Sequence, residues 1–134
     1  MSLERAVSET QRMVPECLAV GVVDMDTGML LSVKTVDSHP QEVLDLVAAA
    51  TGDLYQGPNV SAIEQAFKRS RGVTDDGLHY FQEIIILSSN LIHVFLRSKR
   101  YQSVVLVVVC RNSVNLGMAL SKSRMAMSKV EGEL

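Results

Sequence analysis

The sequence of 134 residues has no tryptophan, only 4% aromatic residues and no tract rich in proline or glycine. Hydrophobic residues make up 47% of the chain against 21% charged residues. A composition with so much apolar side chain excludes intrinsic disorder. At this length the core is large enough to fold without disulfide bonds or a structural metal, so residues 1–134 are expected to form a single domain.

Long hydrophobic runs are also missing. The longest apolar stretch, Val104 to Cys110, is far below the roughly 20 residues that a membrane-spanning helix needs. Residues 1–14 carry four charged side chains, which interrupt the apolar segment that a signal peptide requires. These features predict no membrane insertion and a cytoplasmic protein.

Charge of one sign is not in excess, because the formal net charge at pH 7 is only −2. A chain this close to neutrality has no general attraction for the phosphate backbone of nucleic acids. Nucleic acid is therefore not expected as a partner, although local basic clusters could still contact phosphates or an acidic protein surface.

Residues that hold metals or cofactors are sparse. Cys17 and Cys110 lie far apart in apolar runs, without the paired spacing of a zinc or redox site. The three histidines, His39, His79 and His93, show no pairing at helical spacing. No metal and no cofactor is expected.

Catalytic and nucleotide-binding motifs are absent as well. Asp24, Asp26 and Gly28 resemble the start of a calcium loop, but Gly28 and Thr35 occupy the positions where such a loop needs oxygen ligands. No phosphate-binding loop, dinucleotide-binding glycine pattern or nucleophile elbow occurs. The sequence favours a binding module with no catalytic residues of its own, and not an enzyme.

The hydrophobic periodicity predicts helices and strands in the order α-β-β-α-(α)-β-β-β-α. The second helix begins at a capping box formed by Ser38 and Gln41, with Pro40 in its first turn, and the last helix is capped by Asn112 or Ser113. The expected helices cover residues 3–14, 41–55, 60–69 and about 113–127, and the expected strands cover 17–23, 29–36, 80–87, 91–98 and 103–110. In the short third helix, Ile63 and Phe67 are expected to point inward.

The first and last of these strands are almost entirely apolar, as strands covered on both faces are. We therefore expect them to be central neighbours in a five-stranded antiparallel sheet of the α/β (α+β) class, with helices on both faces. The second strand and the strand from Tyr80 then form the edges. This arrangement brings Cys17 near Cys110, and strand alternation places His93 with Leu91 and Phe95 as a partly buried group that could respond to pH.

Two segments resemble the roadblock/dynein light chain family. The run AVGVVDMDTGMLLS is similar to its first hairpin, and VLVVVCRNSVNLGMALSKSRMAMSKVE is similar to its last strand and closing helix. The resemblance implies a profilin-like fold and a homodimer formed by the Tyr80 edge strand and the helix over 41–55. Residues 81, 83 and 85 share one face of a long apolar edge, which needs a partner. The expected interface comprises Phe81, Glu83, Ile85, Val43, Val47 and Tyr55.

Members of this family bind Ras-like small GTPases and influence their nucleotide cycle, or serve as light chains and adaptors. Bacterial single-domain members include regulators of a polarity GTPase. The resemblance therefore implies a dimeric, non-catalytic regulator of a small GTPase, with a structural adaptor or a small-molecule sensor with a pocket near His93 as alternatives. An arginine supplied to the GTPase could stabilise the charge of phosphoryl transfer. The candidate partner-binding residues are Arg71, Arg97, Lys99 and Arg100.

Overall fold

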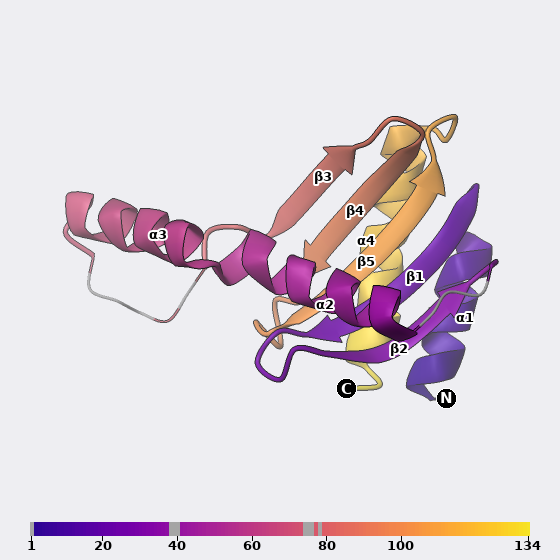
Figure 1. Ribbon diagram of the computed structural model, residues 1–134, viewed down its shortest axis with the longest axis horizontal. Coiled ribbons are helices and arrows are strands. Elements are labelled where there is room, and N and C mark those ends of the chain that lie inside the picture. The colour runs from indigo at the N-terminus through magenta and orange to yellow at the C-terminus, as the bar shows by residue number, and fades with distance from the viewer. Residues whose placement is uncertain (1, 38–40, 74–76, 78) are drawn as a thin grey trace.

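The computed structural model describes residues 2–37, 41–73, 77 and 79–134. Figure 1 shows a sheet flanked by helices. The helices are α1 (Leu3–Met13), α2 (Gln41–Gln56), α3 (Pro58–Ser70) and α4 (Leu116–Glu131), and the strands are β1 (Cys17–Asp24), β2 (Met29–Thr35), β3 (Glu83–Leu87), β4 (Leu91–Arg97) and β5 (Val104–Arg111). This element order is the predicted one. The predicted capping box at Ser38 and Pro40 lies outside the described residues.

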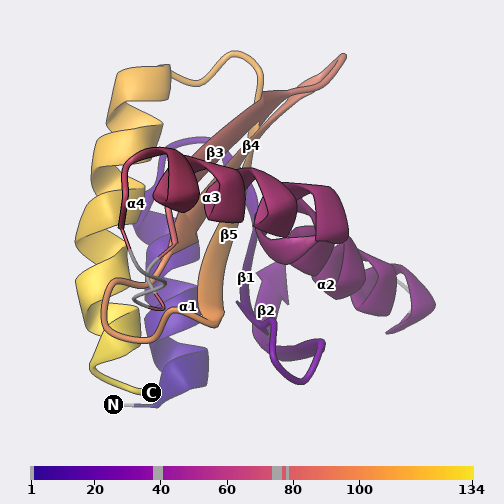
Figure 2. The ribbon, with the colours of Figure 1, turned by 90° about the vertical axis from the view of Figure 1, so that its left-hand side faces the viewer.

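The five strands form one antiparallel sheet in the order β2-β1-β5-β4-β3. The first and last strands are neighbours inside the sheet, and β2 and β3 are its edges, as the sequence predicted. Helices α1 and α4 cover one face and α2 crosses the other (Figures 1 and 2). The predicted fold class is therefore confirmed.

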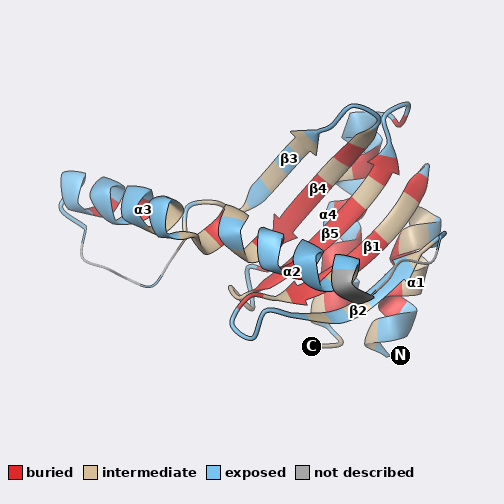
Figure 3. Ribbon diagram, in the orientation of Figure 1, coloured by how far each residue is buried: buried red, intermediate tan, exposed pale blue. Residues whose placement is uncertain are grey.

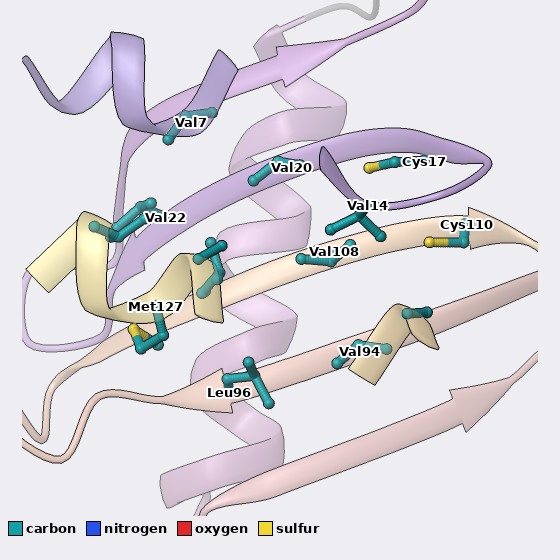
Figure 4. Close-up of a cluster of buried hydrophobic side chains, with 14 of the residues drawn as sticks. Val7, Val14, Cys17, Val20, Val22, Val94, Leu96, Val108, Cys110 and Met127 are labelled. Carbon is teal, nitrogen blue, oxygen red and sulfur yellow. The ribbon is translucent and has the colours of Figure 1, made fainter. Parts of the chain in front are cut away.

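The sheet separates two apolar clusters. The larger lies under α1 and α4 and includes Val7, Val20, Val108 and Met127 (Figure 4). The smaller lies under α2, where Ala48 and Tyr55 pack on side chains of β1, β4 and β5. Because β1 and β5 contribute to both clusters, they need apolar residues at nearly every position, which explains their continuous valine runs.

Helix ends follow local capping. Ser2 caps α1 by accepting a hydrogen bond from the Arg5 N–H. The last helix begins later than predicted, because Asn115 is its cap and accepts from the Met118 N–H. The predicted caps Asn112 and Ser113 lie before it, and the Ser113 hydroxyl instead donates to the Glu16 carboxylate.

The other differences from prediction lie around α3. Helix α3 begins at Pro58, and β3 begins at Glu83, three residues after the predicted start at Tyr80. The Tyr80 N–H donates to the Glu64 carboxylate at 2.6 Å, so the backbone there bonds to α3 and not to the sheet. The residues predicted to point inward from α3, Ile63 and Phe67, are exposed, so this prediction was wrong.

Candidate interaction surfaces

The free edge of the sheet at β3 presents apolar side chains to solvent. Along this strand Glu83, Ile85 and Leu87 are exposed, with Ile85 at 39% and Leu87 at 68%. Ile84 and Ile86 are half-buried and pack against the cluster under α2. Figure 3 shows β3 as an exposed edge beside the buried strand β4. An edge with unpaired backbone groups and exposed apolar residues can accept another strand.

A cleft of about 1050 Å³ lies between this edge and α4. It forms because α4 covers β4 and β5 but leaves β3 open on that face. The Arg124 guanidinium spans the cleft and donates to both Glu83 carboxylate oxygens, at 2.8 and 2.6 Å. These hydrogen bonds hold the pKa of Glu83 below its ordinary value. Ile85 and Met127 contribute apolar lining between the charged groups, and Lys99 and Glu131 also line the cleft.

Two residues of the expected dimer interface do not lie on this surface. The side chain of Tyr55, a residue of α2, is fully buried between the helix and the sheet. Its hydroxyl donates to the Gln82 carbonyl oxygen at 2.9 Å. Phe81 lies before β3 begins, packs against the cluster under α2 and lines the end of the cleft, so it is not part of the exposed strand face that carries Glu83 and Ile85. Strand alternation placed Phe81 wrongly because the strand starts only at Glu83.

Val43 and Val47 are exposed, but they lie at the opposite side of the molecule from β3. Helix α2 crosses the strands, so its first half lies over β2 and β1 and its last half reaches the β3 edge (Figure 1). Val43 and Val47 line an apolar groove of about 320 Å³ between α2 and the sheet. The sheet side of the groove includes Ala19 and Gly21, whose small size leaves the space open. The structure therefore separates the expected interface into a β3 part and a groove part.

Arg97 is buried, with an exposed fraction of 4%. Its guanidinium lies over the Tyr55 ring at 4.7 Å, and Nη2 donates to the Tyr55 carbonyl oxygen at 3.5 Å. Its Nε and Nη1 have no hydrogen-bond partner among the described residues. Burial lowers the pKa of Arg97, while the charge of Glu64 opposes this effect. A side chain held in this way cannot reach a partner's phosphate, so Arg97 does not fit the predicted role.

The other three predicted partner-binding residues are exposed, but Arg71 lies apart from Lys99 and Arg100. Arg71 follows the end of α3, at the tip of the helix that lies far from the sheet (Figure 1). Lys99 and Arg100 lie in the turn between β4 and β5, where the Arg100 N–H and the Ser98 hydroxyl donate to the Glu131 carboxylate of α4. The basic residues thus form two separate sites.

A polar contact that the sequence did not predict joins α3 to the segment before β3. Glu64 is buried, and its carboxylate lies 3.2 Å from His79 Nδ1 and accepts from the Tyr80 N–H. Burial alone raises the pKa of Glu64, but these hydrogen bonds outweigh it and the pKa lies below its ordinary value. The rings of Phe67, in α3, and Tyr80, in the segment before β3, are 5.9 Å apart. No local pattern indicates this contact, because the partners are 15 and 16 residues away.

The predicted positions of Cys17 and Cys110 are confirmed. They are paired across β1 and β5, and both are free and buried. The hydrogen bond with Cys110 and burial raise the pKa of the Cys17 thiol. His93 is half-buried on the α2 face with Leu91 and Phe95, as predicted, and its Nε2 lies 3.1 Å from the Ser88 hydroxyl. Burial lowers the pKa of His93.

Within the described ranges, no helix is long and apolar enough to cross a membrane. The same residues contain no group of three or more His, Cys, Asp or Glu side chains placed to hold a metal ion.

Comparison with known proteins shows the fold. No family model and no curated protein sequence matches the chain. Among solved structures, a roadblock/LC7 domain from Streptomyces avermitilis superposes with a TM-score of 0.70 at 18% identity, over 98% of this chain and 97% of that one. MglB from Myxococcus xanthus gives a TM-score of 0.70 at 18% identity, over 98% and 96%. Profilin from Schizosaccharomyces pombe gives 0.57 at 12% identity, over 98% of each chain. The chain has the roadblock fold, a relative of the profilin fold.

Proposed function

We propose that this protein is a cytoplasmic, non-catalytic regulator that works as a homodimer and binds a Ras-like small GTPase. The observation that carries the proposal is the free β3 edge with Ile85 and Leu87 exposed, in a chain with the roadblock fold. Catalysis has no support in the sequence, which lacks phosphate-binding and nucleophile motifs. Binding is therefore the function that the surface supports best.

The dimer follows from the geometry of the edge. Two antiparallel copies of a strand can pair about a two-fold axis, which gives each copy the same contacts. Centring the pair on Ile85 uses all five residues of β3 and sets each Glu83 opposite the partner's Leu87. The exposed apolar side chains then meet across the joint, and the unpaired backbone groups of both edges are satisfied.

The GTPase part of the proposal rests on the family that the sequence resembles and on exposed basic residues. Lys99 lines the cleft beside β3, and Arg100 lies next to it. A positive group at the rim of a cleft favours an acidic or phosphate-bearing partner surface. We assign Lys99 and Arg100 to partner contact. Arg71 lies at a second, separate site on α3, and Arg97 supports the fold from inside.

The test is affinity capture of the tagged protein's partners from its own cell lysate, loaded in parallel with GDP or a non-hydrolysable GTP analogue. The proposal predicts a Ras-like GTPase enriched in one nucleotide state and reduced in the same capture with the double variant Lys99→Ala and Arg100→Ala. The double variant Arg5→Ala and Arg12→Ala, with two basic residues removed from α1, is the matched control. Capture of other proteins without nucleotide dependence would favour a structural adaptor.

A second candidate function is supported by the groove under α2. Its lining is almost entirely aliphatic and its volume of about 320 Å³ suits a small apolar ligand. A sensor of such a ligand would show a higher melting temperature with decanoate, because a ligand that binds only the folded state stabilises it. The variant Ala19→Leu adds side-chain volume to the groove and should abolish the shift. Equal shifts in both proteins would contradict binding at this place.

A further inference from the structure

Helix α3 extends beyond the β3 edge and has little of the molecule around it. It begins at Pro58, after a break from α2 at the N-cap residue Gly57, and packs mainly against α2. In Figure 1 it projects outward past β3, and in Figure 2 it lies in front of the sheet edge. We call Pro58–Ser70 with Tyr80 the arm. A strand of another chain that pairs with the β3 edge therefore lies close to the arm.

An ordinary amphipathic helix buries its apolar residues and exposes its polar ones, whereas the arm does the reverse. Its buried residues are polar, Glu64 and Lys68, and they lie under the returning segment that contains His79 and Tyr80. The large apolar residues face solvent, with Ile63 at 43% and Phe67 at 49% exposed. These two lie four residues apart on one stripe, and Tyr80 extends that stripe. An apolar stripe on a projecting helix is typical of a surface that another chain covers.

We propose that this stripe is a docking surface for a second copy of this chain, so that each arm packs against the partner beside the paired β3 strands. The inference rests on the proposed dimer and adds to it. Tyr80 is followed by Phe81 and Gln82 and then by β3, so the stripe is continuous with the edge. A copy paired along β3 brings its own exposed Leu87 and the following turn toward the start of the arm.

The small size of the β3 edge favours a contribution from the arm to the dimer interface. A stable dimer buries about 800 Å² on each partner and uses about 20–30 residues a side. The β3 edge offers five residues, Val43 and Val47 lie at the other side of the sheet, and Tyr55 is buried within the chain. The arm is the apolar surface beside β3 that supplies the remaining contacts.

The first experiment places a photoreactive phenylalanine analogue at position 67 of the full chain. The inference predicts covalent dimers after irradiation, with the cross-link mapped by mass spectrometry to a second copy. The same analogue at Ala62, on another side of the helix, should give few or none. Cross-linking at position 67 only within one chain would overturn the inference.

The second experiment measures the dimer dissociation constant by sedimentation equilibrium. The double variant Ile63→Ser and Phe67→Ser should weaken the dimer roughly tenfold or more, because the two apolar side chains lose the area that they bury in the complex. The double variant Ala62→Ser and Ala66→Ser is the matched control and should not. If the wild type dimerises and the first variant dimerises equally well, the arm inference fails and the β3 dimer stands. A monomeric wild type would contradict the proposed function and this inference together.

Discussion

At the scale of single residues, the buried polar groups decide how the projecting part of the molecule is held. Glu64 has a lowered pKa because hydrogen bonds from His79 and Tyr80 outweigh its burial. A carboxyl whose pKa is lower in the folded than in the unfolded chain stabilises the fold above its unfolded value of about 4.3, and this contribution is lost as the pH falls through the folded value.

Glu64→Gln should therefore lower the free energy of unfolding by about 1–2 kcal/mol at pH 7. The difference between wild type and variant should shrink as the pH falls below the ordinary range of a carboxyl group and through the lowered pKa of the folded-state Glu64, because the wild-type carboxyl then becomes protonated. Urea titrations at several pH values measure it. A difference that stays constant over this range would show that the carboxylate charge has no part in the contact.

The Tyr55 hydroxyl gives a second test at this scale. It is buried and donates to the Gln82 carbonyl oxygen, so Tyr55→Phe should lower the free energy of unfolding by about 1 kcal/mol. Tyr101→Phe is the matched control, because its hydroxyl makes no hydrogen bond within the described part of the chain. Equal effects of the two substitutions on urea denaturation would contradict the assignment.

These residues also mark the limit of sequence prediction for the candidate site. Ile85 and Glu83 could be placed on an exposed edge, because alternation within a strand is local. Arg97 and Tyr55 could not be placed, because a cation stacked on a ring 42 residues away leaves no local signal. Ile63 and Phe67 were misplaced for the same reason, since the polar contacts of Glu64 with His79 and Tyr80 determine which side of α3 is buried.

At the scale of elements, the break between α2 and α3 sets the direction of the arm. A Cβ at Gly57 would lie 2.6 Å from the Asp53 carbonyl oxygen, whereas a Cβ at Gly52, inside α2, would meet nothing within 4 Å. Gly52→Ala should raise the free energy of unfolding by about 0.5–1 kcal/mol, because alanine is the better helix former. Gly57→Ala should lower it. Thermal melts of the two variants compare them, and shifts of the same sign would be inconsistent with this geometry.

Strands were easier to predict than helix ends. The continuous valines of β5 and the near-continuous apolar run of β1 identify strands buried on both faces, and their central pairing follows directly. The ends of helices and strands were harder to predict, because each depends on single hydrogen bonds. Asn115 caps α4, although Asn112 and Ser113 are equally good capping residues, and the Tyr80 N–H bonds to α3 and delays the start of β3.

At the scale of the whole molecule, the helices cover the sheet unevenly. Helices α1 and α4 cover one face, α2 crosses the other, and the β3 edge stays open beside the arm. The sheet has two edges, and both carry exposed apolar residues: Ile85 and Leu87 on β3, and Met29, Leu31 and Val33 on β2. Ile85 and Leu31 are equally exposed, at 39%. Only the β3 edge is flanked by the cleft and the arm. We propose that two copies join at this edge.

Sedimentation equilibrium of the wild type, Ile85→Lys and Leu31→Lys tests whether the dimer forms at this edge. A lysine on β3 would place two like charges opposite each other at the two-fold axis, where they repel and prevent pairing. We predict twice the mass of the chain for the wild type and for Leu31→Lys, and the mass of one chain for Ile85→Lys. A wild type that stays monomeric at all concentrations, or an Ile85→Lys variant that remains a dimer, would contradict the account.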